Sequence, residues 1–108
     1  MTVIELNQSQ FHSLVDSGDS PVLVEFQAPW CVYCRRISPA LAKVAQQRGD
    51  TLVVAQVNID DEPQLALREQ IEVVPTLVLY HKGEALGSIV APESRARIEE
   101  FLEDYLGN

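Results

Sequence analysis

Three residues separate the run Val22-Leu23-Val24-Glu25-Phe26 from the run Trp30-Cys31-Val32-Tyr33-Cys34. The first run is almost entirely apolar and rich in β-branched residues, which predicts a strand that is buried on both faces. From Cys34 to Ala45 the apolar residues recur at helical spacing instead. Both cysteines therefore lie at the junction of a buried strand and a helix, and this junction is typical of an α/β domain.

The rest of the chain continues this alternation. Apolar runs predict further strands over residues 3–6, 52–57, 76–80 and 85–90, and periodicity predicts helices over residues 10–15, 63–69 and 94–106. Asn7 or Ser9 is the expected N-cap of the first helix, and Gly83 is expected to turn the last two strands into a hairpin. Periodicity alone predicts that the strand over residues 76–80 runs parallel to its predecessor.

The length and composition restrict the class of protein. The chain has 108 residues, of which 46% are hydrophobic, and its net charge is −8. These values predict one domain over residues 1–108 and argue against binding to nucleic acid or to an anionic membrane, which both favour a basic surface. The stretch MTVIELNQSQ lacks the positive and apolar regions of a signal peptide, so we expect a cytoplasmic protein.

Cys31 and Cys34 are the only cysteines in the chain. A bridge between them would close almost no loop, so redox chemistry is a better reason for the pair than stabilisation. The start of a helix stabilises a thiolate at Cys31, and Cys34 is close enough to attack the sulfur of Cys31. Zinc needs about four ligands, and neither His12 nor His81 lies at metal-motif spacing, so we expect no metal.

The whole chain resembles the thioredoxin family, most clearly from Val22 onward. The residues that carry the resemblance are Val22-Leu23-Val24-Glu25-Phe26, Ala28-Pro29-Trp30-Cys31, Cys34, Pro39, Val57-Asn58-Ile59-Asp60, Val74-Pro75-Thr76 and Lys82-Gly83. The resemblance implies the thioredoxin fold, in which a central mixed sheet has helices on both faces. It also implies that the strand over residues 76–80 runs antiparallel and that the bond before Pro75 is cis.

The resemblance further implies a thiol–disulfide oxidoreductase that acts on protein disulfides through a Cys31/Cys34 dithiol–disulfide cycle. We expect a monomer without a cofactor that is recycled by a disulfide reductase. Trp30, Val74, Pro75 and Ala91 are the expected substrate-binding residues, with Ala91 at a position where the family has a glycine. The dipeptide Val32-Tyr33 replaces the usual Gly-Pro, and Gln27 replaces a common Trp.

Glu25 is the expected third catalytic residue. It is the one charged residue of its apolar run, so desolvation should raise its pKa. The resemblance places an acidic residue here beneath the second cysteine, where it handles the proton of Cys34. The family's usual Lys partner is replaced by Gln56.

Several interpretations of the sequence stay open at this point. The chain is either an oxidoreductase, in a reducing, oxidising or isomerising role, or an interaction or chaperone-like module without redox turnover. Tyr33 is expected to be exposed between the cysteines. Arg35 and Arg36 oppose the helix dipole, and they either favour the thiolate, meet acidic partners or are simply solvated. The acidic run over residues 60–62 is interpreted as a solvated helix start.

Overall fold

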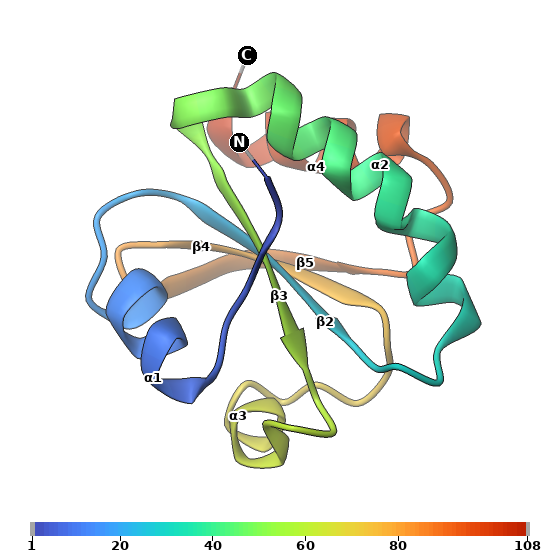
Figure 1. Cartoon of the computed structure of the whole chain (residues 1–108). Helices are drawn as coiled ribbons and strands as arrows, with labels where there is room; N and C mark the ends of the chain where they lie inside the picture. Colours follow the sequence, from blue (N-terminus) through green and yellow to red (C-terminus); the bar gives the residue numbers. More distant parts are fainter. Residues whose placement is uncertain (1, 108) are drawn as a thin grey trace.

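A five-stranded mixed sheet with the strand order β1-β3-β2-β4-β5 runs through the middle of the molecule (Figure 1). The computed structural model describes residues 2–107. The strands are β1 (Ile4–Glu5), β2 (Val22–Gln27), β3 (Val53–Asn58), β4 (Thr76–His81) and β5 (Glu84–Val90). The α-helices are α1 (Gln8–Phe11), α2 (Val32–Arg48), α3 (Pro63–Arg68) and α4 (Arg95–Leu106).

Strands β1, β2 and β3 are parallel, whereas β4 pairs antiparallel with both β2 and β5. The prediction of a parallel strand from periodicity was therefore wrong, and the direction implied by the family resemblance is confirmed. The six residues of α3 rise only about 9 Å, whereas the six residues of β3 extend about 20 Å. The connection through α3 stays at the end of the sheet where β3 finishes (Figure 1), so β4 starts there and runs back.

The two faces of the sheet bury different side chains of β2. Leu23 packs in a cluster with Ile37 and Leu41 of α2 and with Ile98 and Leu102 of α4. The opposite face has its own cluster, which contains Val22, Val24, Phe26, Phe11, Leu65 and Tyr80. Successive side chains of a strand alternate between the two faces of the sheet, so a buried strand needs cover on both. The helices that were expected on both faces are confirmed.

The first helix differs in detail from its prediction. Asn7 is the N-cap, and a reciprocal pair of hydrogen bonds with Gln10 forms a capping box. The α-helix ends at Phe11 and continues as a π-helical turn over His12–Asp16, in which the Ser17 N–H donates to the His12 carbonyl at 3.0 Å. Among the helices between residues 2 and 107, none is both long and apolar enough to span a bilayer.

Candidate active site

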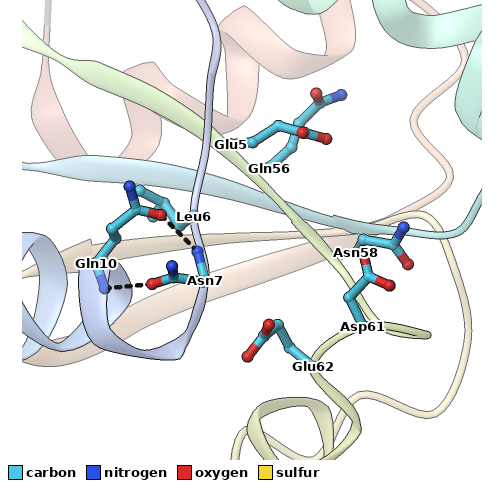
Figure 2. A pocket seen from close by; sticks show the side chains of 8 residues that line it. All are labelled: Glu5, Leu6, Asn7, Gln10, Gln56, Asn58, Asp61 and Glu62. Carbon is cyan, nitrogen blue, oxygen red and sulfur yellow. Dashed lines mark hydrogen bonds between the residues drawn. The ribbon is translucent and has the colours of Figure 1, made fainter.

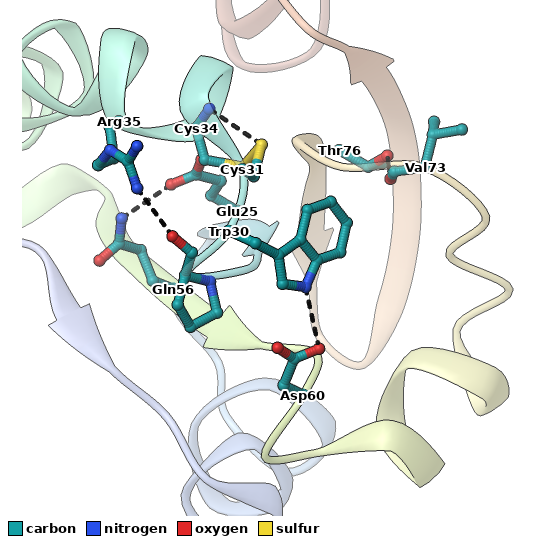
Figure 3. Close-up of a disulfide and its surroundings, with 10 residues drawn as sticks. Glu25, Trp30, Cys31, Cys34, Arg35, Gln56, Asp60, Val73 and Thr76 are labelled. Atoms are coloured by element: carbon teal, nitrogen blue, oxygen red, sulfur yellow. Dashed lines mark hydrogen bonds between the residues drawn. A yellow bond between two sulfur atoms is a disulfide. The ribbon is translucent and has the colours of Figure 1, made fainter.

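The two cysteines join the end of β2 to the start of α2 and form a disulfide (Figure 3). Cys31 has an extended backbone and is the N-cap of α2, where its Sγ accepts the Cys34 N–H at 3.1 Å. The first N–H groups of a helix have no partner within the helix and carry partial positive charge. When the disulfide is reduced, this position favours negative charge on the Cys31 sulfur.

Several residues around the disulfide form a small apolar cluster of their own. Ala28, Cys31 and Cys34 are buried together, and Val74 packs against them from the loop before β4. Trp30 lies beside this cluster but is 64% exposed, and its Nε1 donates to Asp60 Oδ1 at 3.4 Å. Asp60 was expected to be merely solvated. Nothing in the local sequence indicates this contact, because the two residues are 30 positions apart.

The loop that faces the cysteines contains a cis bond between Val74 and Pro75, as the resemblance implied. The Ala91 N–H donates to the Pro75 carbonyl at 2.9 Å, so the end of β5 supports this loop. Ala91 has a φ of +46°, a left-handed conformation that favours glycine and costs other residues about 1–2 kcal/mol. This backbone explains why a glycine is usual at this position.

The side chains of Tyr33 and Arg35 both donate hydrogen bonds to backbone carbonyls near the start of α2. The Tyr33 hydroxyl donates to the Pro92 carbonyl at 3.2 Å, and the side chain is half-buried. The expectation that Tyr33 is exposed between the cysteines was therefore wrong. Arg35 Nη1 donates to the Pro29 carbonyl at 2.8 Å, which ties the helix to the loop that precedes Cys31.

Glu25 is completely buried, with an exposed fraction of 0%. It follows Leu23 by two residues on the same face of β2, so its side chain lies on the α2 side, toward the end of β2 from which the chain enters α2. Gln56 Nε2 donates to Glu25 Oε1 at 2.8 Å, whereas Oε2 has no hydrogen-bond partner among residues 2–107 (Figure 3). Desolvation by burial raises the pKa of Glu25 to about 7, although the Gln56 hydrogen bond lowers it. The predicted direction of the pKa shift is confirmed.

Gln56 also contributes to a pocket of about 200 Å³ at the β1 edge of the sheet (Figure 2). Carboxylate and amide side chains dominate the pocket, whose lining residues are Glu5, Leu6, Asn7, Gln10, Gln56, Asn58, Asp61 and Glu62. Its carboxylates are not gathered as metal ligands, since the described part of the chain contains no group of three or more His, Cys, Asp or Glu side chains suited to a metal ion. The cysteines do not line this pocket.

A disulfide between cysteines three positions apart, at the start of a helix on a mixed α/β sheet, defines a thiol–disulfide oxidoreductase acting on protein disulfides. The Thioredoxin family profile matches residues 2–104, and the chain belongs to the thioredoxin family. The chain is 32% identical to a thioredoxin of Porphyra purpurea over 98% of this chain and 99% of that one. It is 34% identical to thioredoxin 1 of a Nostoc species, with 94% and 95% coverage. A bifunctional thioredoxin reductase/thioredoxin of Mycobacterium leprae is 32% identical over 97% of this chain and 23% of its own length.

Proposed function

We propose that this thioredoxin family member reduces disulfides in protein substrates, with Cys31 as the attacking sulfur and Cys34 as the resolving sulfur. The observation that carries this assignment is the asymmetry of the pair about the start of α2. The Cys31 sulfur occupies the N-cap and accepts the Cys34 N–H, whereas Cys34 itself lies inside the first turn. The free N–H groups therefore stabilise a thiolate on Cys31 in preference to Cys34.

The reaction then proceeds through two exchanges. The Cys31 thiolate attacks one sulfur of the substrate disulfide, the substrate S–S bond breaks, and the other substrate sulfur leaves as a thiolate. Cys34 loses its proton and attacks the Cys31 sulfur, which breaks the mixed disulfide and releases the second substrate thiolate. The substrate gains two electrons, and the protein is left with the Cys31–Cys34 disulfide that the structure contains.

Glu25 is the proposed acceptor of the Cys34 proton, directly or through one water molecule. Its unpartnered Oε2 is available for a proton, while Oε1 is held by Gln56. A pKa raised to about 7 suits a group that must accept and release a proton near neutral pH. The alternation of β2, which puts Glu25 on the α2 side, supports this role.

Trp30, Val74, Pro75 and Ala91 form the proposed substrate-binding surface. Val74 packs against the cysteines, Trp30 is exposed beside them, and Ala91 supports the Pro75 loop through its backbone N–H. An exposed aromatic ring next to a buried disulfide offers contact area to a protein chain without enclosing it. This arrangement supports a protein substrate more than a small molecule in a closed cavity.

We also propose a reducing, cytoplasmic setting in which a monomeric protein is recycled by a disulfide reductase. The name of the Mycobacterium leprae relative, which joins a thioredoxin reductase to a thioredoxin, supports such a partner. The cysteine content supports a reducing compartment, since the only two cysteines of the chain form the redox pair and neither is part of a structural disulfide.

An insulin-reduction assay tests the reducing role. With dithiothreitol as the electron source, the protein should accelerate the precipitation of the insulin B chain well above the dithiothreitol background. The matched control is the double variant Cys31→Ser/Cys34→Ser, which lacks both sulfurs and should keep the fold, because the bridge closes almost no loop. A rate equal to that of this control would instead favour the alternative of an interaction module without redox turnover.

A further inference from the structure

The charges of this protein are distributed very unevenly along the chain. Residues 26–49 contain no Asp or Glu, and α2 contains Arg35, Arg36, Lys43 and Arg48. The other parts of the chain contain four basic residues against all 16 acidic ones. A molecule with a net charge of −8 thus has one helix with a charge of +4, and that helix starts at the redox pair.

The positive charge of α2 lies on its exposed face. Val32, Arg36, Pro39 and Lys43 follow the alternating spacing of four and three residues that keeps side chains on one side of a helix, and all four are exposed. Arg35 is exposed beside them, whereas Arg48 is paired with Glu99 at 3.1 Å. Within residues 2–107, none of Arg35, Arg36 and Lys43 forms an ion pair, so their charges remain uncompensated.

We infer that the exposed basic face of α2, formed by Arg35, Arg36 and Lys43, docks protein substrates that carry acidic residues beside their disulfide. Figure 1 shows α2 leading away from the end of β2 and across the sheet. Lys43 is twelve residues from Cys31, which corresponds to about 18 Å along the helix. A typical interface of about 800 Å² per partner has a radius of about 16 Å, so a protein centred on Cys31 covers Arg35 and Arg36, and its edge comes within reach of the long Lys43 side chain.

The rest of the molecule argues for an acidic protein patch over a nucleic acid or a membrane. Screening limits charge interactions to about 8 Å at physiological salt, so the basic face acts on groups in contact with it. The molecule measures only 34 × 31 × 21 Å, and an extended polyanion on α2 would also meet the acidic residues around it. A local acidic patch on a folded or unfolded protein gains the attraction without this repulsion.

The side of the active site that lies away from the basic face of α2 is acidic, so the two sides together orient a bound substrate. Asp60 lies next to Trp30 and accepts its Nε1–H, and Asp61 and Glu62 follow it in the chain. A partner whose acidic residues face α2 avoids these carboxylates. The charges therefore select the orientation in which the substrate disulfide approaches Cys31, as well as the substrate.

Two disulfide-bridged peptides of equal length test the inference, one with Glu and one with Lys at the six positions that follow the bridge, because six extended residues span about 20 Å and can reach from Cys31 to Lys43. At low salt the wild type should reduce the Glu peptide with a kcat/KM about tenfold above that for the Lys peptide, because each exposed charge pair contributes a factor of about 2–5. This preference should vanish in high salt. Equal rates for the two peptides, or a faster Lys peptide, would overturn the inference.

A pair of charge-matched variants locates the effect. Lys43→Glu should lower the preference for the Glu peptide about threefold or more, whereas Lys82→Glu, which makes the same charge change at the β4–β5 turn, should leave it nearly unchanged. Equal effects of both variants would show that net charge matters and α2 does not. If Lys43→Glu does not fold, Lys43→Gln should still halve the preference.

Two further readouts separate this inference from the proposed function. All variants should reduce the neutral hydroxyethyl disulfide at the wild-type rate, since Lys43 is far from the sulfurs. If the wild type itself does not reduce hydroxyethyl disulfide, this result refutes the proposed redox role and not the docking surface. Competition by micromolar duplex DNA against the Glu peptide would show that α2 binds polyanions generally, and the assignment to acidic proteins would then be wrong.

Discussion

Glu25 and Tyr80 are two buried polar side chains on neighbouring strands, yet their surroundings differ. Tyr80 extends from β4 toward the α1 and α3 face, and its hydroxyl donates to Glu69 Oε1 at 2.6 Å. Arg68 Nε donates to the other oxygen of Glu69 at 2.8 Å, and the same guanidinium holds both oxygens of Asp16 at 3.0 and 3.1 Å. Burial and the bond to Glu69 raise the pKa of Tyr80, which stays neutral.

Glu25 extends toward the opposite face and is only half satisfied. Gln56 holds one carboxylate oxygen, and the other oxygen has no partner within residues 2–107. A buried polar group without a partner costs about 1–3 kcal/mol, so the fold gains nothing from it. The fully paired polar group serves stability, whereas the half-paired one is the group for which we propose proton transfer.

The largest effect is expected from the sulfurs themselves. Cys31→Ser and Cys34→Ser should each abolish turnover of a protein disulfide, but only Cys34→Ser should accumulate a mixed disulfide with the substrate, because its attacking sulfur remains. Non-reducing gels of each variant after incubation with oxidised insulin provide the measurement. A mixed disulfide that accumulates in Cys31→Ser would reverse the assigned roles.

Glu25 should make the stability of the protein depend on pH. Its pKa is raised to about 7 in the folded state, so below the unfolded value both states hold the proton and the carboxyl has no pH-dependent effect. Between about pH 4.5 and pH 7 the unfolded state releases the proton first, and stability falls by about 3 kcal/mol relative to Glu25→Gln.

Urea unfolding of the oxidised protein at several pH values measures this loss. The control is Glu5→Gln, at an exposed position on β1, which should show no such pH-dependent difference from the wild type. A constant difference between wild type and Glu25→Gln from pH 4.5 to pH 8 would mean that the carboxyl is not desolvated as described.

Tyr80 should contribute to stability and not to the exchange reaction. Tyr80→Phe removes the donor to Glu69 and should lower the free energy of unfolding by about 1–2 kcal/mol. The rates of thiol–disulfide exchange should stay unchanged, because Tyr80 lies on the face away from α2. A fall in exchange rate without a loss of stability would show that the Tyr80 face of the sheet also takes part in the reaction, contrary to the role assigned to it.

The smallest effect is expected at Gln56. Gln56→Leu removes a hydrogen bond that favours the charged carboxylate and should raise the pKa of Glu25, whereas Gln56→Lys introduces a cation and should lower it. The pH midpoint of the stability loss should therefore move in opposite directions, by about one pH unit or less for the Leu variant. Shifts in the same direction would show that Gln56 acts by packing and not through its amide.

These contacts also show what a sequence can predict. The apolar runs of β2 and β4 predicted buried strands, and the spacing of Cys31 and Cys34 predicted the redox pair, because such patterns are local. The direction of β4 does not follow from periodicity, since a strand buried on both faces looks the same either way. Family resemblance supplied the direction.

Contacts between distant segments were beyond local patterns. The bonds from Trp30 to Asp60 and from Tyr33 to Pro92 join residues 30 and 59 positions apart. The desolvation of Glu25 was predicted from its apolar neighbours. Its hydrogen bond to Gln56 depends on the parallel register of β2 and β3, which pairs the two residues. Only the folded chain defines that register.

The role proposed for Glu25 is to accept the Cys34 proton during resolution. Stopped-flow mixing of the reduced protein with 5,5′-dithiobis(2-nitrobenzoic acid) releases one coloured thiolate when Cys31 attacks and a second when Cys34 resolves the mixed disulfide. Between pH 6 and pH 9, Glu25→Gln should leave the first phase nearly unchanged and slow the second about tenfold or more. Equal second-phase rates in wild type and Glu25→Gln across that range would contradict this role of Glu25.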